Sequence, residues 1–386
     1  MIATATTPDA RTALLDACAR ALDHPGACLR EWKQRHPAAH VVGYFPTYVP
    51  TELIYACGAL PTGLWGGSIA VSRANAYIQQ FTCSIVRSTT EYALHGAFDQ
   101  LDAVLFPPIC DSAKLVASIW ALNFSERFMV DMVTLPERLD SDASVAYLAA
   151  ELRRVGATLA QKLGVTIDDG ALACAIDRCN RLRASQQAFC SRRATLEATM
   201  PLAHAAAVLK AGTLMHADDY LPLLDAFLAE LTSDARSRRS KIPVVVSGLA
   251  CQLPHPDFLA LFDEAGFAVV GDDLLLGMCG GVAVATGGDP YLALARAFTQ
   301  GPPLATRHHD TIHRHEFILD QWQRGAARGV VFLVPKFCEP EWFDLRYLKA
   351  EMEKRGIPNL VLDFDEDPTG FGPVLTRLEA FAEILM

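Results

Sequence analysis

Short apolar runs alternate with segments of helical pattern in two separate parts of the chain. The runs typical of strands lie at residues 40–46, 60–65, 101–106 and 127–131 in the first part and at 242–248, 267–271, 329–334 and 359–364 in the second. Parallel neighbours need a crossover connection, usually a helix, whereas antiparallel strands can be joined by a tight turn. Strands separated by helices therefore predict an α/β fold with two Rossmann-like (flavodoxin-like) parallel-sheet domains.

Helical patterns fill the connections between these strands. We expect helices at residues 11–35, 50–58, 83–96, 111–122, 255–266, 306–324, 340–355 and 370–385. Residues 141–235 differ from both flanks, because they are rich in Ala and Leu and show almost no strand pattern. The sequence thus predicts an N-terminal helical segment, a first α/β domain, a helical segment joining the domains and a second α/β domain, at residues 1–39, 40–140, 141–240 and 241–386.

The bulk composition excludes several classes of protein. The 386 residues carry a formal net charge of −10, which gives no electrostatic basis for binding nucleic acid or an anionic membrane. No apolar run reaches the roughly 18 residues of a transmembrane helix. The N-terminus lacks the basic and apolar regions of a signal peptide. We therefore expect a cytoplasmic protein with no nucleic-acid or membrane partner.

One short motif follows a predicted strand in each half of the chain. PPICD (107–111) comes directly after LDAVLF, and PKFCE (335–339) comes directly after GVVFLV. Proline cannot donate to a strand ladder, so each strand should end there and each cysteine should lie near the start of the next helix. Open α/β sheets bind ligands beyond the carboxyl ends of their strands. Cys110 and Cys338 are therefore expected in one cleft between the domains.

Cys83 offers a third sulfur at a predicted helix start, with Thr82 as the expected N-cap. The N–H groups of a helix N-terminus lower a thiol pKa and stabilise an anionic centre. Three thiolates from separate loops suit an iron–sulfur cluster with one iron left open. The alternative is that these cysteines are buried core side chains. The 11 cysteines are odd in number and include no C-x-x-C, which argues against a disulfide framework and a zinc ribbon.

Several polar residues have two interpretations each. His309 and His313 are four residues apart, so they could share a helix face as metal ligands or lie on a solvated helix face. Asp111 and Glu339 each follow a cysteine of the repeated motif, either as helix caps or as proton donors beside the cluster.

Aromatic and basic residues could contact an organic ligand. Tyr44, Trp65 and Trp120 fall near predicted strand ends or flanking helices, where they could line a flat apolar pocket for an aryl ring or simply fill the core. Arg307 or Arg314 could reach a phosphate of a CoA ligand, although nothing in their spacing requires it.

At its cysteine blocks the sequence resembles the catalytic subunits of the benzoyl-CoA reductase and 2-hydroxyacyl-CoA dehydratase family. The resemblance runs from about residue 40 to the C-terminus and rests on PTELIYACGALP (50–61), FTCS (81–84), PPICD (107–111), VPKFCE (334–339), IPNLVLD (357–363) and TRLEAF (376–381). It implies that Cys83, Cys110 and Cys338 hold a [4Fe-4S] cluster at the domain interface. Within the family, AYIQQFTCSIVR (76–87) looks closest to the smaller cluster-binding subunit of ATP-dependent benzoyl-CoA reductase.

The sequence departs from the family pattern after a pair of acids. Many members have Cys-Thr-Gly there, whereas this chain has DDLLLG (272–277), with Cys279 as the nearest cysteine. Double-cubane members of the family need further cysteines for a second cluster. Cys57, Cys251 and Cys279 are the available candidates, but their pattern differs from that of those members.

The resemblance implies the [4Fe-4S] subunit of an ATP-driven benzoyl-CoA reductase, which transfers low-potential electrons to an aromatic acyl-CoA and dearomatises the ring. It also implies a related second cluster-binding subunit and a separate ATP-hydrolysing activator, since this chain shows no Walker A motif. Three alternatives stay open: a 2-hydroxyacyl-CoA dehydratase subunit, a stand-alone double-cubane electron-transfer or reductase protein, and a non-enzymatic two-domain ligand-binding protein.

Overall fold

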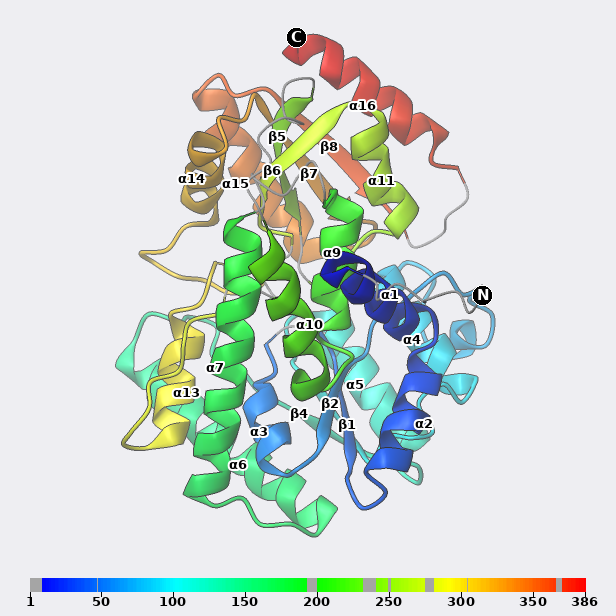
Figure 1. Cartoon of the computed structure of the whole chain (residues 1–386), viewed down its shortest axis with the longest axis vertical. Helices are drawn as coiled ribbons and strands as arrows, with labels where there is room; N and C mark the ends of the chain where they lie inside the picture. Colours follow the sequence, from blue (N-terminus) through cyan, green and yellow to red (C-terminus); the bar gives the residue numbers. More distant parts are fainter. Residues whose placement is uncertain are drawn as a thin grey trace, which may run out of the picture.

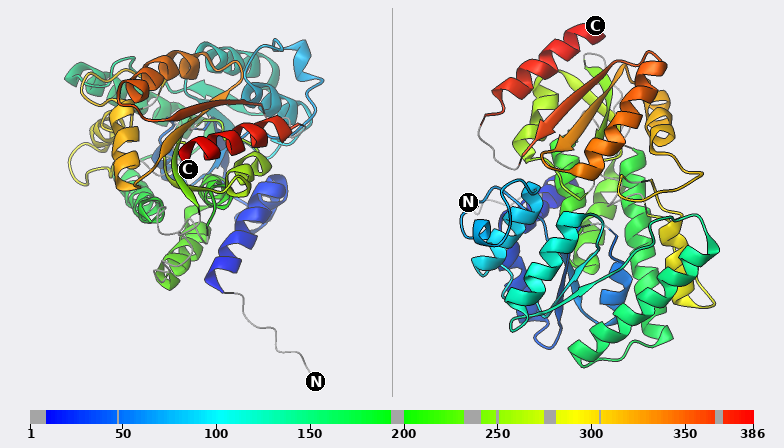
Figure 2. Two further views of the ribbon diagram at one scale, coloured as in Figure 1. Left: turned by 90° about the horizontal axis from the view of Figure 1, so that it is seen from above. Right: turned by 180° about the vertical axis from the view of Figure 1, so that it is seen from behind.

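Two four-stranded parallel sheets, each packed among helices, form the framework of the protein (Figure 1). The computed structural model describes residues 9–46, 48–192, 200–231, 241–248, 251–274, 281–303, 305–365 and 370–386. The rear view in Figure 2 shows the sheets one above the other along the long axis, with helices around both. This architecture confirms the predicted α/β fold with two Rossmann-like parallel-sheet domains.

The first sheet has the strand order β2-β1-β3-β4, and all its neighbouring strands are parallel. Its strands are β1 (Val41–Tyr44), β2 (Leu60–Gly63), β3 (Ala103–Phe106) and β4 (Met129–Met132). The helices along this part of the chain are α3 (Thr51–Ala56), η1 (Ala74–Ala76, a short 3-10 helix), α4 (Ser84–Leu94) and α5 (Asp111–Phe124). Every residue of β1 and β3 is buried, as expected for parallel strands covered on both faces.

The second sheet repeats the topology of the first, with the order β6-β5-β7-β8 and parallel pairs throughout. Its strands are β5 (Ile242–Gly248), β6 (Phe267–Asp272), β7 (Gly329–Pro335) and β8 (Asn359–Phe364). Its helices are α11 (Pro256–Glu264), α14 (Arg314–Arg324), α15 (Glu339–Lys354) and α16 (Gly372–Leu385). Because β3 and β7 take equivalent places, the loops that carry Cys110 and Cys338 are equivalent as well.

The remaining helices support the sheets from the side. They are α1 (Ala10–Asp23), α2 (Pro25–Arg35), α6 (Asp142–Leu163), α7 (Asp169–Ser191), α9 (Leu202–Ala211), α10 (Ala217–Glu230) and α13 (Pro290–Thr299). α1 packs on α9 and α10, α7 packs on α3 and α10, and α6 packs on α13. In Figure 1, α7, α9 and α10 lie between the region of the first sheet and that of the second. These helices therefore bridge the two sheets.

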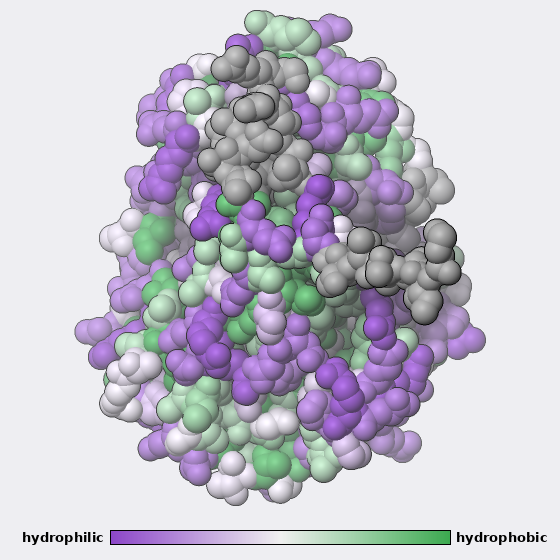
Figure 3. Space-filling model, in the orientation of Figure 1, coloured by the Kyte–Doolittle hydropathy of each residue, from purple (hydrophilic) through white to green (hydrophobic). Residues whose placement is uncertain are grey.

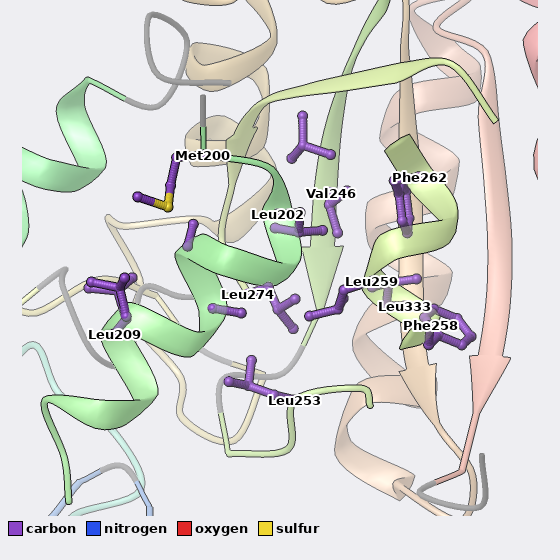
Figure 4. Close-up of a cluster of buried hydrophobic side chains, with 14 of the residues drawn as sticks. Met200, Leu202, Leu209, Val246, Leu253, Phe258, Leu259, Phe262, Leu274 and Leu333 are labelled. Carbon is purple, nitrogen blue, oxygen red and sulfur yellow. The ribbon is translucent and has the colours of Figure 1, made fainter. Parts of the chain in front are cut away.

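One hydrophobic core joins the helical segment to the second sheet. Figure 4 shows Leu202 of α9 close to Val246 of β5, with Phe258 of α11 in the same buried cluster. All three side chains are at most 1% exposed. Burial of a large apolar side chain contributes about 1.5–3 kcal/mol, so this shared core fixes α9 against the sheet.

The surface mixes residue types. Figure 3 shows hydrophilic and apolar residues interspersed over one face of the molecule. Within the described part of the chain, no helix combines the length and the apolar character needed to cross a bilayer.

Two sequence expectations about helices are wrong. The helix predicted at 306–324 begins only at Arg314, because the His309 ring accepts hydrogen bonds from the Thr311 and Ile312 N–H groups and holds them in a turn. His313 is the N-cap of α14, so His309 and His313 share no helix face.

The residue bounds predicted for the two α/β domains and the helical segments stay predictions.

Helix α13 (Pro290–Thr299) was not expected. Asp289 caps it by accepting from the Tyr291 and Leu292 N–H groups, and Pro290 occupies the first turn. Asp followed by Pro before an apolar run is a sequence pattern typical of the start of a helix. The surrounding glycines obscured that signal in the sequence.

Candidate functional site

Each of the three predicted cysteines is the N-cap of a helix. Cys83 precedes α4, Cys110 precedes α5 and Cys338 precedes α15. Cys83 itself, rather than Thr82, takes the N-cap position of α4. The first turn of a helix leaves N–H groups without intrahelical partners, and these groups favour an anionic sulfur. The predicted position of the sulfurs at helix starts is confirmed, whereas their role as ligands stays a prediction.

The residues next to these cysteines do not have the predicted roles. The Cys110 Sγ itself accepts a hydrogen bond from the Ala113 N–H at 3.4 Å. The Asp111 side chain is 93% exposed, and Glu339 is also exposed. Neither carboxylate therefore caps its own helix, α5 or α15, or lies as a proton donor in the buried interior.

A tight turn holds Cys338 against the first turn of α15. Its N–H donates to the Pro335 carbonyl at 3.1 Å, and Cys338 is the N-cap residue of α15. Phe337 adopts a φ of 62°, in the left-handed region that non-glycine residues seldom occupy. Such strain persists only where the surrounding structure enforces it, and it concentrates at functional sites.

Cys251, just after β5, lies beside the other three cysteines. It packs in the same buried cluster as Cys110 and Cys338. Burial raises the pKa of the Cys251 thiol, and three neighbouring thiols raise it further. These are the thiols of Cys338, Cys83 and Cys110. The structure therefore brings all three predicted sulfurs, and a fourth, within electrostatic reach of one another.

A hydrogen bond ties the two halves of the chain together at this point. The Gln252 side chain donates to the Ser84 hydroxyl, and both residues are buried. These two residues directly follow Cys251 and Cys83. The cysteine site thus lies where the two sheets meet, as the sequence predicts.

The sulfur side chains of the site are compatible with an iron–sulfur cluster. Among the described residues, no three Cys, His, Asp or Glu side chains are placed to hold one metal ion. A four-iron cube is larger, and each iron takes its own thiolate, so the sulfurs around it stand farther apart. Thiolate is also the usual protein ligand of such clusters.

Burial has the largest effect on the pKa of the Cys110 and Cys338 thiols. It raises the pKa of Cys110 and Cys338 above the ordinary thiol value of 9.0. At Cys110 the Ala113 and Ser112 N–H groups offset this effect only in part. The lowered thiol pKa expected from the helix starts is therefore wrong. A coordinating metal deprotonates a thiol outright, so buried thiols are still compatible with a ligand role.

Arg314 joins the loops at the edge of the second sheet. Its guanidinium pairs with Asp273 at 2.6 Å and with Glu341 and Asp344 at 2.9 Å each. It also donates to the Gly248 carbonyl at 2.8 Å. One side chain, only 6% exposed, thus connects the ends of β5 and β6 to the start of α15. Arg314 is engaged inside the protein and is not the phosphate contact considered from the sequence.

We predict that Arg314→Met destabilises the protein by about 3–5 kcal/mol, because it leaves the buried Asp273 and Glu341 carboxylates without a counter-charge. Urea unfolding measures the loss. The control is Arg324→Met, which breaks an exposed pair with Asp320 and should cost less than about 1 kcal/mol. Equal losses of unfolding free energy in the two variants would contradict a stabilising role for the ion pairs of Arg314.

Glu91 on α4 anchors the segment that leads to Cys83. Its carboxylate, 0% exposed, accepts from the backbone N–H groups of Ser72 at 3.0 Å, Arg73 at 3.2 Å and Ala74 at 2.7 Å. Burial raises the pKa of this carboxyl, but the N–H donors outweigh burial and hold the pKa at about 2.

We predict that Glu91→Gln lowers the free energy of unfolding by about 1.5–3 kcal/mol at neutral pH. The folded pKa lies below the ordinary value of 4.5, so this stabilisation is complete above about pH 4.5 and is lost as the pH falls toward 2. Thermal unfolding across this range should therefore show a smaller acid dependence in the variant. Glu126→Gln, at an exposed position, is the control and should match the parent.

A cavity of about 240 Å³ lies between α3, α7 and the ends of β1 and β2. Tyr44, Tyr48, Tyr55 and Trp65 line part of its wall, together with aliphatic side chains of α7 and α13. Two of the three aromatic residues considered from the sequence therefore lie here. The third, Trp120, is 0% exposed in the core of the first sheet.

Two arginines of different character line this cavity. Arg183 is paired with Glu52 at 2.6 Å, so its charge is compensated. The Arg307 side chain is 3% exposed, and its closest paired carboxylate, on Glu137, is 3.9 Å away and 82% exposed. Among the described residues, neither the Arg307 Nε nor the Arg183 Nε has a hydrogen-bond partner, and the Arg307 Nε belongs to the guanidinium without a close carboxylate. An unused buried donor beside apolar walls suits a carbonyl or anionic oxygen of a ligand.

The cavity and the cysteines are neighbours. The Arg307 Nη2 donates to the Pro108 carbonyl at 3.3 Å, two residues before Cys110. Tyr48, in the cavity wall, lies within electrostatic reach of Cys251. A ligand in the cavity would therefore lie near the loop that carries Cys110.

The buried charges of Glu52 and Glu91, and the half-buried charge of Arg183, were not predicted from the sequence. Glu52 and Arg183 are 131 positions apart, so no local pattern joins them. The available signal was a glutamate inside the otherwise apolar helix segment at 50–58. Of the cysteines offered for a second cluster, Cys57 is the buried C-cap of α3, and Cys279 lies outside the described residues.

The structure defines an α/β protein with two parallel sheets and a cavity beside the strand ends of the first sheet, where open α/β sheets bind ligands. Comparison with known proteins identifies the family. A family profile described as "2-hydroxyglutaryl-CoA dehydratase, D-component" matches residues 46–385. The chain belongs to this family of 2-hydroxyacyl-CoA dehydratase and benzoyl-CoA reductase subunits, which confirms the resemblance found in the sequence.

Three relatives cover nearly the whole chain. The C subunit of benzoyl-CoA reductase from Thauera aromatica is 28% identical, over 92% of this chain and 93% of its own length. The beta subunit of lactoyl-CoA dehydratase from Anaerotignum propionicum is 31% identical, over 89% and 91%. The beta subunit of (R)-2-hydroxyglutaryl-CoA dehydratase from Acidaminococcus fermentans is 27% identical, over 97% and 99%. These relatives are subunits of enzyme complexes that act on CoA thioesters, so a subunit of such a complex is supported.

Proposed function

We propose that this chain is the [4Fe-4S] subunit of an ATP-driven benzoyl-CoA reductase, a cytoplasmic oxidoreductase that acts on CH–CH groups and dearomatises the ring of an aromatic acyl-CoA. The observation that carries the proposal is the placement of Cys83, Cys110 and Cys338 at three helix starts beside an aromatic-walled cavity. The similarity to the C subunit of benzoyl-CoA reductase over most of both chains supports it.

Cys83, Cys110 and Cys338 would hold the cluster. When bound, the cluster would supply electrons of low potential one at a time. The helix N-termini at the three cysteines would stabilise its negative charge. Cys83 and Cys338 are each 8% exposed, so the surrounding protein would keep water away from the sulfurs. Such burial lowers the reduction potential of an anionic centre.

The cavity would hold the aryl group of the thioester. Its volume of about 240 Å³ is below the roughly 300–1,000 Å³ of pockets for drug-sized ligands, so it suits a ring and leaves the nucleotide of CoA outside. Arg307 would donate to the thioester oxygen. Burial raises the pKa of the Tyr44 and Tyr48 phenols, so both stay protonated and able to donate a hydrogen bond.

Two kinds of partner would complete the enzyme. A related second cluster-binding subunit is supported by the relatives, which are themselves named as single subunits of larger enzymes. An ATP-hydrolysing activator would deliver the electrons, as the family resemblance implies. No nucleic acid or membrane takes part in this scheme.

The first prediction of this proposal concerns iron. The chain purified without oxygen should contain roughly four irons and as many sulfides. Cys83→Ser, Cys110→Ser and Cys338→Ser should each lose most of that iron. The control Cys18→Ser, at a cysteine that is 1% exposed within α1, should retain it. About eight irons per chain would favour a double-cubane protein instead. No iron, even after reconstitution with the partner subunit, would favour a non-enzymatic ligand-binding protein.

A 2-hydroxyacyl-CoA dehydratase subunit is the second candidate. The observation that favours it is the 31% identity to the beta subunit of lactoyl-CoA dehydratase. The complete complex with its activator should be assayed with benzoyl-CoA and with lactoyl-CoA. Ring reduction supports the reductase, whereas loss of water from lactoyl-CoA alone replaces it with the dehydratase.

We further predict that Arg307→Gln raises the KM for the thioester about 10- to 100-fold, because a charged hydrogen bond contributes about 1.5–3 kcal/mol. The iron content should stay at the parental value. Arg138→Gln, at a side chain that is 62% exposed, is the control and should leave KM unchanged. An unaltered KM in Arg307→Gln would remove this residue from the binding site.

A further inference from the structure

We propose that Cys251 is the fourth protein ligand of the cluster, so that each of the four irons is bound by one cysteine of this chain. The inference rests on the proposed function, because it assumes that Cys83, Cys110 and Cys338 hold a [4Fe-4S] cluster. It goes beyond that function in assigning a role to a cysteine outside the three motif blocks.

The sheet topology places Cys251 at the correct edge. β5 and β7 are parallel neighbours, and Gly248 at the end of β5 lies opposite Leu333 of β7. Cys251 follows Gly248 by three residues, and Cys338 follows Leu333 by five. Parallel strands end at the same edge of a sheet, so both sulfurs leave the sheet on the same side.

Side-chain contacts bring Cys251 to the remaining sulfurs. The hydrogen bond from Gln252 to Ser84 holds the backbone at Cys251 next to the backbone at Cys83. Cys110 packs against the buried cluster that contains Cys251. The cysteine segments of both halves of the chain therefore meet around Cys251.

Cys251 differs from the buried cysteines elsewhere in the core. Cys18 lies within α1, and Cys57 is the C-cap of α3. Cys251 instead follows β5 at the edge of the second sheet, and its neighbour Gln252 is bonded to Ser84, the residue after Cys83. Its place in the fold therefore sets it apart from these two core cysteines.

A fourth thiolate would change what this subunit does. It would take the position at which a substrate oxygen could otherwise bind iron. Four thiolates also carry one more negative charge than three, and greater negative charge lowers the potential of a cluster. The chain would then pass electrons to a ring held in the neighbouring cavity or to the partner subunit, and it would not hold a substrate hydroxyl on iron.

The test compares Cys251→Ser with the parent, each as the full-length chain purified without oxygen and without the partner subunit, so that the signal comes from this chain's cluster. Cyanide, which binds an open iron, is the probe. The electron paramagnetic resonance spectrum of the reduced parent should not respond to cyanide. Cys251→Ser should keep most of its iron, show a higher midpoint potential and respond to cyanide. The matched control is Cys57→Ser, 6% exposed in the same core cluster, which should behave as the parent.

Two results would overturn the inference. One is a parental spectrum that already shifts with cyanide, which needs no variant and so does not depend on whether a variant folds. The other is a Cys251→Ser protein with the spectrum and potential of the parent. If iron is present and depends on Cys83, Cys110 and Cys338, these results defeat only the role of Cys251. If the parent binds no iron, the proposed function fails with it.

Discussion

The parallel arrangement of both sheets is the constraint on which the site depends. All strands of a parallel sheet end at one edge, and the segment that follows each strand must leave from that edge. Because the two sheets repeat one strand order, the loops after β3 and β7 are equivalent, and they carry Cys110 and Cys338. The Arg314 network lies at the same edge of the second sheet. The arrangement of the polar residues thus follows from the direction of the strands.

Much of this arrangement could be predicted from the sequence, because it depends on local patterns. The strands at 242–248 and 359–364 coincide with the predicted residues, since continuous apolar runs bounded by turn residues are typical of buried parallel strands. Placement of Cys110 at a helix start followed from the proline that ends the preceding strand. The blocks around the cysteines also sufficed to recognise the family that the comparisons show.

The features that the sequence did not reveal depend on contacts between distant residues. Cys251 carries no local motif, and its position depends on the packing of β5 beside β7 and on the hydrogen bond between Gln252 and Ser84. Arg307 lies in a turn that was expected to be helical, and its unused Nε becomes evident only inside the folded cavity. The pKa values of the Cys110 and Cys338 thiols are raised, although the sequence predicted that they would be lowered. The reason is that the depth of burial is a property of the whole fold. Local helix-start arguments do not include it.

The hydrogen bond between Gln252 and Ser84 has a consequence for how the protein matures. It lies where the first and second sheets meet, between a segment made early in synthesis and one made more than 150 residues later. Cys83 and Cys110 come from the early part and Cys338 from the last. A cofactor held by all of them could be inserted only after the second sheet has docked on the first. Cofactor insertion would then report that the whole chain has folded, and a truncated chain would carry no cofactor.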